Sequence, residues 1–211
     1  MQYSIILWDF DGTLADTLPG LLRIFNDLAP EFGLEPIEDA QAMRDTPPSD
    51  LLRQRGIRWW KMIRLRNAIV RRQKNEIDSI RLFPDVPEML ERLHASGYRL
   101  GVVSSNSAAN IRRCLQASDA EQWFELVVGS WQPLGKHRSL RRVLRRTGVH
   151  PQQALYVGDE VRDITAARRA GMDAAAVTWG GNTRHLLAQY HPEKLVDDPI
   201  ELTGWLTDVS R

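Results

Sequence analysis

The stretch Ile5-Ile6-Leu7-Trp8-Asp9-Phe10-Asp11-Gly12-Thr13-Leu14 places two carboxylates at the end of a short apolar run. The apolar part is typical of a strand buried on both faces of a sheet, and the glycine that follows indicates the turn that ends it. Buried carboxylates are costly unless a positive group binds them. Asp9 and Asp11 therefore indicate either a site for a divalent cation and a phosphate group, or two solvated acids at an ordinary strand end.

Further short apolar runs without polar alternation predict the other strands of a buried parallel sheet. They lie at 100–103, 126–128, 154–157 and 174–177. Helical patterns separate them, at 87–96, 111–117, 139–147 and 164–170. We expect Asp85 and Glu88 to form a capping pair at the first of these helices, and Gly97 to end it. The alternation predicts an α/β fold, with a Rossmann-like parallel sheet core flanked by helices.

The segment from Asp16 to Leu82 breaks this alternation, because it holds helical patterns and no predicted strand. A helical segment of this length between the first two strands predicts an inserted α-helical cap. We therefore expect two domains, an α/β core formed by residues 1–15 and 83–211 and a helical cap formed by residues 16–82.

A basic run inside this insert, residues 53–74, contains no acidic residue. The apolar side chains that can share one helix face there are Trp59, Met62, Ile63, Ile69 and Val70. We expect this face to pack inside the cap and the basic face to be solvated. An alternative is an electropositive cap that attracts anionic substrates, and a surface for an acidic partner is a weaker one. The pair Trp59-Trp60 fits either packing between cap and core or a wall beside the substrate.

Polar side chains follow four of the predicted strands, at the edge where open parallel sheets bind ligands. They are Asp9 and Asp11, then Ser104 and Ser105, then Lys136, then Asp159 and Asp163. Each has an ordinary explanation as a helix cap, a surface lysine or an acid favoured at a helix start. The two last acids are four residues apart and can share one helix face. Together, carboxylates, hydroxyls and an ammonium at one edge predict a site for Mg²⁺ and phosphate.

The same segments resemble, in order, the four motifs of the haloacid dehalogenase superfamily. They are Asp9-Phe10-Asp11-Gly12-Thr13, Ser104, Lys136, and Gly158-Asp159 with Asp163. The resemblance spans nearly the whole chain, and the insert after the first motif is similar to the superfamily's helical cap. Only about 30 residues separate the second and third motifs, too few for the larger α/β cap of other members. Residues 156–164 and Thr178-Trp179-Gly180 are similar to phosphoglycolate-phosphatase-like members.

The resemblance implies a phosphatase that acts through an aspartyl-phosphate intermediate. Asp9 would be the nucleophile, and Asp11 would protonate the leaving oxygen and then activate water. Mg²⁺ would be held by the Asp9 carboxylate, the Asp11 backbone carbonyl and Asp159. The presence of Asp11 favours phosphoryl transfer over dehalogenation, because dehalogenation of carbon needs no acid for a leaving alkoxide.

The remaining implied roles concern the phosphate and its surroundings. Ser104, Ser105 and Lys136 would bind the phosphoryl group, and Asp163 would act on Lys136 or on metal-bound water. The substrate would be a small phosphorylated metabolite, with phosphoglycolate suggested by analogy alone. The alternatives are a phosphomutase of the same fold and a non-catalytic binding or regulatory protein.

Length and composition limit the remaining function classes. A chain of 211 residues suits one core domain with a small insert, and a net charge of +1 argues against a nucleic-acid partner. No apolar stretch reaches membrane-spanning length, and we expect no signal peptide, because the first strand-like run begins at Ile5. The single cysteine, Cys114, excludes an intramolecular disulfide. We expect a cytoplasmic protein that is a monomer or a homodimer.

Overall fold

The computed structural model describes residues 2–39, 44–45, 58–76, 80–129 and 135–208. Within them the chain forms a six-stranded sheet of order β3-β2-β1-β4-β5-β6, and every neighbouring pair is parallel. The strands are β1 (Ile5–Trp8), β2 (Arg99–Ser104), β3 (Phe124–Gly129), β4 (Ala154–Gly158), β5 (Asp173–Val177) and β6 (Lys194–Val196). The predicted α/β class with a parallel sheet is confirmed.

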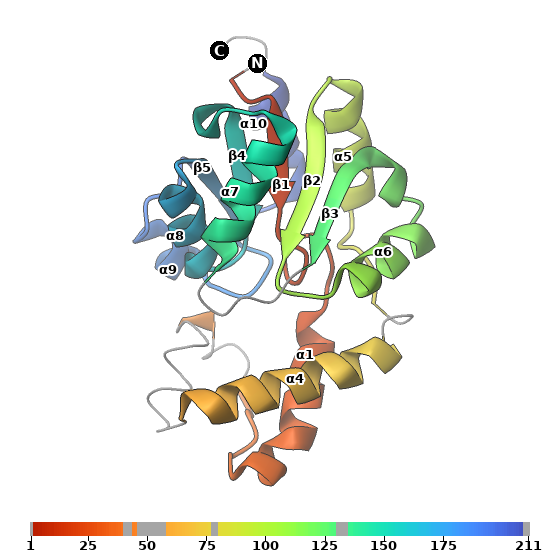
Figure 1. Cartoon of the computed structure of the whole chain (residues 1–211), viewed down its shortest axis with the longest axis vertical. Helices are drawn as coiled ribbons and strands as arrows, with labels where there is room; N and C mark the ends of the chain where they lie inside the picture. The colour runs from red at the N-terminus through yellow and green to blue at the C-terminus, as the bar shows by residue number, and fades with distance from the viewer. Residues whose placement is uncertain (1, 40–43, 46–57, 77–79, 130–134, 209–211) are drawn as a thin grey trace.

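Helices cover both faces of this sheet (Figure 1). The helices of the described residues are α1 (Leu18–Leu28), α4 (Trp59–Glu76), α5 (Val86–Ala95), α6 (Ala108–Ala117), α7 (Lys136–Thr147), α8 (Val161–Ala170), α9 (Arg184–Ala188) and α10 (Pro199–Thr207). Short 3₁₀ turns lie at η1 (Ala29–Phe32), η3 (Glu121–Trp123) and η4 (Pro151–Gln153). Helices α7, α8 and α9 pack on one face, and α5, α6 and α10 on the other. No helix among the described residues has the length and apolarity needed to cross a membrane.

Alternating side chains of β1 supply both layers of the core. Ile5 and Leu7 join the cluster under α7 and α8, whereas Ile6 and Trp8 join the cluster under α5 and α10. This follows from the two-residue period of a strand whose neighbours lie on both sides. All four side chains are fully buried. Packing on both faces thus holds the first strand in place, so the residues that follow it extend from a rigid strand end.

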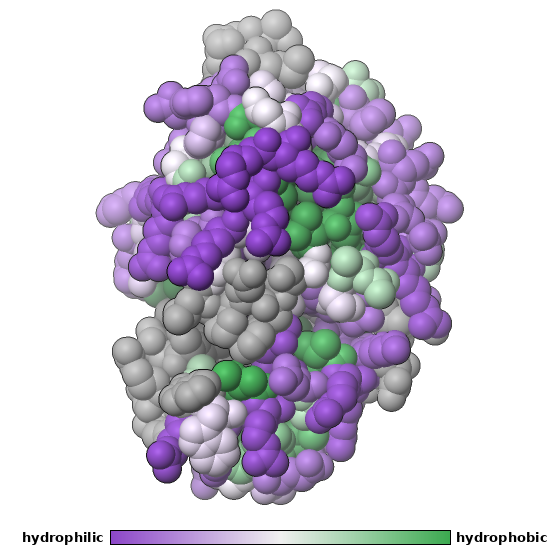
Figure 2. All heavy atoms as spheres, viewed as in Figure 1, coloured by the Kyte–Doolittle hydropathy of each residue, from purple (hydrophilic) through white to green (hydrophobic). Residues whose placement is uncertain are grey.

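Helix α7 is amphipathic, with Leu140, Val143 and Leu144 buried against the sheet. Its outer side carries arginines and no acidic residue. Figure 2, drawn in the same view as Figure 1, shows a hydrophilic band where α7 crosses the front of the sheet. The burial of three large side chains therefore places a dense positive charge at the surface of this helix.

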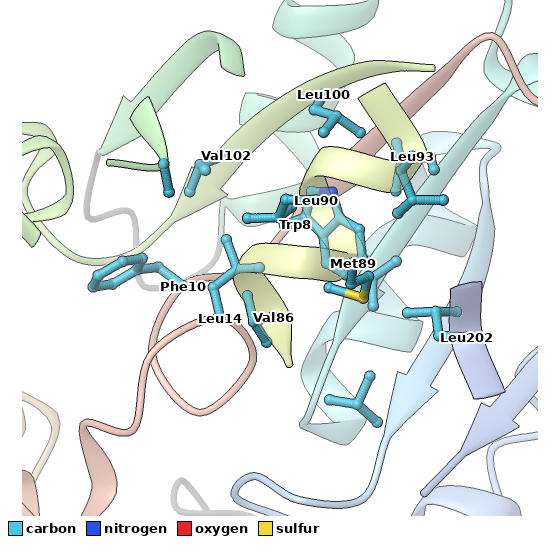
Figure 3. Close-up of a cluster of buried hydrophobic side chains, with 14 of the residues drawn as sticks. Trp8, Phe10, Leu14, Val86, Met89, Leu90, Leu93, Leu100, Val102 and Leu202 are labelled. Carbon is cyan, nitrogen blue, oxygen red and sulfur yellow. The ribbon is translucent and has the colours of Figure 1, made fainter. Parts of the chain in front are cut away.

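The opposite layer is centred on Trp8, which packs among side chains of α5 (Figure 3). Met89, Leu90 and Leu93 of α5 are each at most 2% exposed. Phe10 and Leu14, which flank the turn after β1, lie in the same cluster and are fully buried. Apolar packing therefore holds the loop that carries Asp9 and Asp11 on both sides of the turn.

Helices α1 and α4 lie beyond the end to which the arrowheads of β2 and β3 point (Figure 1). They share a small cluster of their own, in which Ile24 and Leu28 of α1 meet Leu65 of α4. Phe25, Phe32, Leu34, Ala68 and Ile69 pack around it. The two helices therefore sit at the carboxyl edge of the sheet, where the predicted site residues are.

Several local expectations need correction. Asp85 precedes α5 with a φ of 64° and makes no side-chain cap hydrogen bond, so the expected capping pair is wrong. Leu65 was not named on the predicted apolar face of α4, yet it is buried, while Met62, Ile63 and Val70 are only half-buried and the side chain of Trp59 lies outside the described part. Strand β6 and helices α9 and α10 lie outside the predicted elements.

Candidate active site

Asp9 is the first residue after β1 and is 1% exposed. Its backbone N–H donates to the Val157 carbonyl at 2.9 Å, which continues the pairing of β1 with β4. The N–H of Phe10 donates to Oδ1 of Asp9 at 2.8 Å. Gly12 then turns the chain with a φ of 77°, a conformation that side-chain-bearing residues rarely adopt. The strand and the turn together hold the Asp9 carboxylate at the carboxyl edge of the sheet.

Lys136 is the first residue of α7, and its ammonium lies between two carboxylates. Nζ donates to Oδ2 of Asp9 at 2.6 Å and to Oδ1 of Asp163 at 2.5 Å. It also lies 5.4 Å from the centre of the Tyr156 ring, a favourable cation–π position. The side chain is 14% exposed. A lysine at a helix start is thus explained by the two acids that it binds.

Asp159 follows β4 and is held by groups that cannot neutralise it. The hydroxyl of Thr13 donates to Oδ1 at 2.7 Å, and the N–H of Gly181 donates to Oδ2 at 2.6 Å. The residue lies before α8, which begins at Val161, so the expectation that Asp159 and Asp163 share a helix face is wrong. They meet because the turn after β4 and the first turn of α8 fold toward the same point.

Asp163 belongs to the first turn of α8, where Oδ2 accepts the N–H of Glu160 at 3.1 Å. Ligand oxygens of Asp9, Asp159 and Asp163 all lie within 4.8 Å of one another, and the three residues are buried. Gly158 makes this approach possible, because a Cβ there would lie 2.5 Å from Cβ of Asp163. Three buried carboxylates therefore lie close together, and two of them bind the Lys136 ammonium.

The charges of this cluster shift its pKa values in opposite directions. Burial alone would lower the pKa of Lys136, but the Asp163 and Asp9 carboxylates outweigh burial and raise it well above its usual range. Burial alone would raise the pKa of Asp9, but Lys136 and Arg162 hold it below its usual value. The pKa of Asp159 is raised well above its usual value by burial and then by Glu160, Asp163 and Asp9.

The raised pKa of Asp159 indicates what the cluster lacks. Among the described residues no basic side chain donates to this carboxylate, and the lysine is already shared by the other two. Hard carboxylate oxygens at this spacing fit a small divalent cation such as Mg²⁺, which prefers oxygen ligands. The donor set of the structure therefore fits the metal that the sequence predicted.

Asp11 points to a different set of partners. Nδ2 of Asn106 and Nε2 of Gln73 donate to its Oδ1, at 3.0 Å and 3.2 Å. Burial and the nearby charge of Asp9 raise the pKa of Asp11, although the Thr17 side chain and the two amide donors oppose the shift. Asp9 and Asp11 are therefore in unlike environments, one paired with a lysine and the other held by neutral amides.

Ser104 ends β2 and is 4% exposed, and its Oγ accepts the N–H of Asn106 at 3.2 Å. It does not cap α6, because that position is taken by Ser107, whose Oγ accepts the N–H of Asn110. Ser105 is half-buried, and its carbonyl accepts Nη2 of Arg66 from α4 at 2.9 Å. The structure thus brings Ser104 and Ser105 to the edge where Asp9 and Lys136 lie.

The basic residues of the segment 53–74 differ in their exposure and in their partners. Residues 53–57 lie outside the described residues, Arg64 and Arg71 are exposed, and Arg72 lies 3.6 Å from both Asp27 and Glu31. Burial and the charge of Arg162 lower the pKa of Arg66 to about 10, which leaves it protonated at neutral pH. Trp60 is 36% exposed, and Arg58 lies over its ring. The basic face of α4 is therefore solvated only in part.

Sequence reasoning missed several residues of this site. Thr13 and Gly181 hold Asp159, and Asn106 with Gln73 holds Asp11. Asn106 lies directly after Ser104 and Ser105, so its position beside the predicted strand end was an available signal. Gln73 had none, because it stands alone in a basic run 62 residues from Asp11.

Comparison with known proteins agrees with this geometry. Residues 6–177 match the family model described as haloacid dehalogenase-like hydrolase. A phosphoglycolate phosphatase from Synechococcus elongatus is 37% identical over 208 residues, which cover 98% of each chain. A probable phosphatase, IndB, from Dickeya dadantii is 30% identical, over 95% of this chain and 92% of that protein.

Solved structures show the same fold. A haloacid dehalogenase-like family hydrolase from Streptococcus pneumoniae has a TM-score of 0.82 and 25% identity, over 98% of this chain and 99% of that one. A predicted phosphatase from Clostridium acetobutylicum has a TM-score of 0.86 at 18% identity, over 99% and 100% of the two chains. With its family-model match and its curated relatives, this chain belongs to the haloacid dehalogenase-like hydrolase family and is phosphoglycolate phosphatase-like.

Proposed function

We propose that this chain is a Mg²⁺-dependent phosphatase that hydrolyses a small phosphorylated metabolite through an aspartyl-phosphate on Asp9. The observation that carries the proposal is the position of Asp9, which follows β1, binds Lys136 at 2.6 Å and faces Asp159 and Asp163. A buried carboxylate whose pKa is held low stays ionised, as a nucleophile must. The phosphatase names of the relatives support the same reaction class.

In the first step, a carboxylate oxygen of Asp9 attacks phosphorus and the bond from phosphorus to the ester oxygen breaks. Asp11 gives its proton to that oxygen, so an alcohol leaves. The raised pKa of Asp11 favours the protonated form that this step requires. Lys136, Ser104 and Ser105 bind the phosphoryl oxygens and balance the charge that gathers on them.

In the second step, Asp11 takes a proton from a water molecule whose oxygen attacks the phosphorus of the aspartyl-phosphate. The bond between phosphorus and Asp9 breaks, which releases phosphate and restores the carboxylate. The two steps return Asp11 to its protonated form. Asp163 holds Lys136 in place through both steps, since it binds the same ammonium as Asp9.

The metal would be held by the carboxylates of Asp9 and Asp159 and by the backbone carbonyl of Asp11. When bound, Mg²⁺ supplies positive charge that reduces repulsion between these carboxylates and the phosphate. Asp159 is the ligand that most needs it, because burial and neighbouring acids raise its pKa. Thr13 and Gly181 keep its two oxygens in a fixed orientation.

Residues 16–82 would act as a cap domain over a core formed by residues 1–15 and 83–211. The separate apolar cluster of α1 and α4, and their place at the carboxyl edge of the sheet, support this division. Phosphoglycolate is the substrate we propose to test first, because a relative of 37% identity carries that name. A cytoplasmic location and a monomeric or homodimeric state stay predictions.

The test is Asp9→Asn, assayed for phosphate release from a panel of phosphate esters, phosphoglycolate included, with Mg²⁺. We expect a loss of at least about 10⁴-fold in kcat with folding retained, because the nucleophile is gone. The control is Asp119→Asn, the same change at an exposed residue with a φ of 50°, where asparagine is well tolerated. Full activity of Asp9→Asn would contradict the mechanism. An isomerised phosphate ester without free phosphate would indicate a mutase instead.

A further inference from the structure

Gln73 brings an amide from α4 into the site of the core. It is 4% exposed, and its Nε2 lies 3.2 Å from Oδ1 of Asp11. Its neighbour Lys74 is exposed, as are Arg71 and Arg72. A buried polar side chain in an otherwise basic and exposed turn requires a specific partner, because an unpaired buried amide is costly. The partner is the carboxylate that the proposed mechanism uses as acid and base.

Asn106 makes the second contact to the same oxygen, and its orientation is fixed. Its Oδ1 accepts the N–H of Ser107 at 2.7 Å and Nδ2 of Asn110 at 3.2 Å. The NH₂ group must therefore face the other way, toward Oδ1 of Asp11 at 3.0 Å and Oε1 of Gln73 at 3.4 Å. Because Oε1 of Gln73 accepts from Asn106, its Nε2 is the atom that donates to Asp11.

Two N–H donors bind the same oxygen of Asp11, and they fix the orientation of its carboxyl group. Oδ1 is occupied as an acceptor, so a proton carried by this carboxyl group resides on Oδ2. A proton given to the leaving oxygen would therefore have to come from Oδ2. Both donors are neutral, so they fix the orientation of Asp11 without adding a positive charge beside it.

Helix α4 is fastened to the core close to this contact. Arg66, two turns before Gln73, donates to the Ser105 carbonyl at 2.9 Å. Leu65 and Ile69, on the adjoining face of the helix, pack in the cluster shared with α1. The position of Gln73 over Asp11 therefore depends on how α4 is seated on the loop after β2.

We propose that Gln73, together with Asn106, is a positioning residue that holds Asp11 with Oδ2 toward the leaving oxygen, so that the seating of α4 on the core sets the geometry of proton transfer. The inference rests on the proposed role of Asp11. It gives α4 a function in the chemical step, in addition to any part in substrate recognition.

The test compares two substrates that differ in their need for a proton. An alkyl phosphate has a poor leaving group and needs the acid, whereas p-nitrophenyl phosphate has a good leaving group and does not. Gln73→Met keeps the length of the side chain and removes the amide. We expect kcat/KM for the alkyl phosphate to fall by about 10- to 100-fold, a part of the whole acid contribution, and that for p-nitrophenyl phosphate to fall less than about 3-fold. Because kcat/KM covers the steps up to departure of the leaving group, water attack does not enter.

The matched control is Lys74→Met, the same replacement at the exposed neighbour, which should leave both values unchanged. Equal losses for the two substrates, or no loss for either, would overturn the inference. If Gln73→Met does not fold, Gln73→Asn makes the same test by withdrawing the amide by one methylene.

Asp11→Asn separates the two proposals. If Asp11→Asn loses kcat/KM equally for the two substrates, the proposed role of Asp11 is wrong. If Asp11→Asn loses more with the alkyl phosphate while Gln73→Met does not, only the proposed role of Gln73 is wrong.

Discussion

The ammonium of Lys136 lies 2.6 Å from Oδ2 of Asp9, the residue that follows the first strand, although 127 positions separate the two in the chain. The same ammonium lies 2.5 Å from Oδ1 of Asp163. One cation therefore stabilises two buried carboxylates. Since each carboxylate also accepts a backbone N–H, the geometry of all three groups is fixed before any substrate arrives.

Lys136→Met should destabilise the fold as well as remove activity. Loss of the cation leaves Asp9 and Asp163 buried without the ammonium that binds both of them, a change that costs about 3–5 kcal/mol at neutral pH. The pKa of Asp9 is low because of Lys136, so it should rise in the variant. The variant can then protonate its carboxylates, and the difference from wild type should shrink as the pH falls from 7 toward 5.

Urea unfolding without added metal at several pH values measures this difference. Lys74→Met is the control, since it removes an exposed ammonium and should leave stability within about 0.5 kcal/mol. A pH-independent loss would mean that the carboxylates are not the source of the effect.

The strand ends show how far the sequence could predict this site. Runs such as Ile5–Trp8 and Ala154–Val157 are apolar throughout because both faces of the sheet are covered, so they were recognisable without the structure. The polar residues directly after them meet because the carboxyl ends of parallel strands share one edge. The local pattern and the parallel topology together were enough to group Asp9, Ser104 and Lys136.

The parts that escaped prediction depend on tertiary contacts. Strand β6 is three residues long and only Val196 is buried, so it has no apolar run to recognise. Leu65 lies three residues after Met62 and four before Ile69, so the helical period allows it on the apolar face, and the packing of α1 is what buries it. Gln73 meets Asp11 only because α4 is seated on the core. A sequence pattern can predict which face of a helix or strand is buried, but it cannot predict which other element packs against that face.

Asp159→Asn should stabilise the protein in the absence of metal and abolish stabilisation by Mg²⁺. The folded-state pKa of Asp159 lies above its unfolded value, so the stability that this group contributes is present below the unfolded pKa and is lost as pH rises through the folded pKa. The neutral amide avoids this loss. It can still accept the Gly181 N–H and donate to the Thr13 hydroxyl.

Thermal unfolding at pH 7 without metal should show a rise in Tm of about 2 °C or more, equivalent to about 1 kcal/mol for a chain of this size. The rise should shrink as the pH falls below 4 and disappear near about pH 3, where the carboxyl group is mostly protonated in both states. Saturating Mg²⁺ should raise the Tm of wild type and of the Asp119→Asn control, but not that of Asp159→Asn. A metal-dependent rise in Asp159→Asn would exclude this residue as a ligand.

Gly180→Ala should damage the site through close contact rather than charge. A Cβ on Gly180 would collide with the carbonyl oxygen of Gly12 and would lie 2.5 Å from Oδ2 of Asp159. The backbone of the first turn would have to shift, so we expect a loss of about 1–3 kcal/mol and a weaker response to Mg²⁺. Gly204→Ala is the matched control, because nothing lies within 4 Å of its Cβ and the residue is exposed in α10. It should raise stability by about 0.5–1 kcal/mol. Equal effects of the two variants would contradict the close-contact argument.

Repulsion on the outer face of α7 should make the fold more stable at high salt. The exposed arginines there are Arg138, Arg141, Arg142, Arg145 and Arg146, and the helix contains no acidic residue. Arg142 stands one turn from three of the others, so Arg142→Glu should convert repulsion into attraction and raise Tm by about 1–3 °C at low ionic strength. Arg142→Gln only removes the charge and should give a smaller rise. Both gains should diminish in about 1 M NaCl, where screening is nearly complete, while the wild-type Tm rises. A gain that persists in high salt would point to helix propensity instead of charge, since the wild type and the two variants differ only in the side chain at this position.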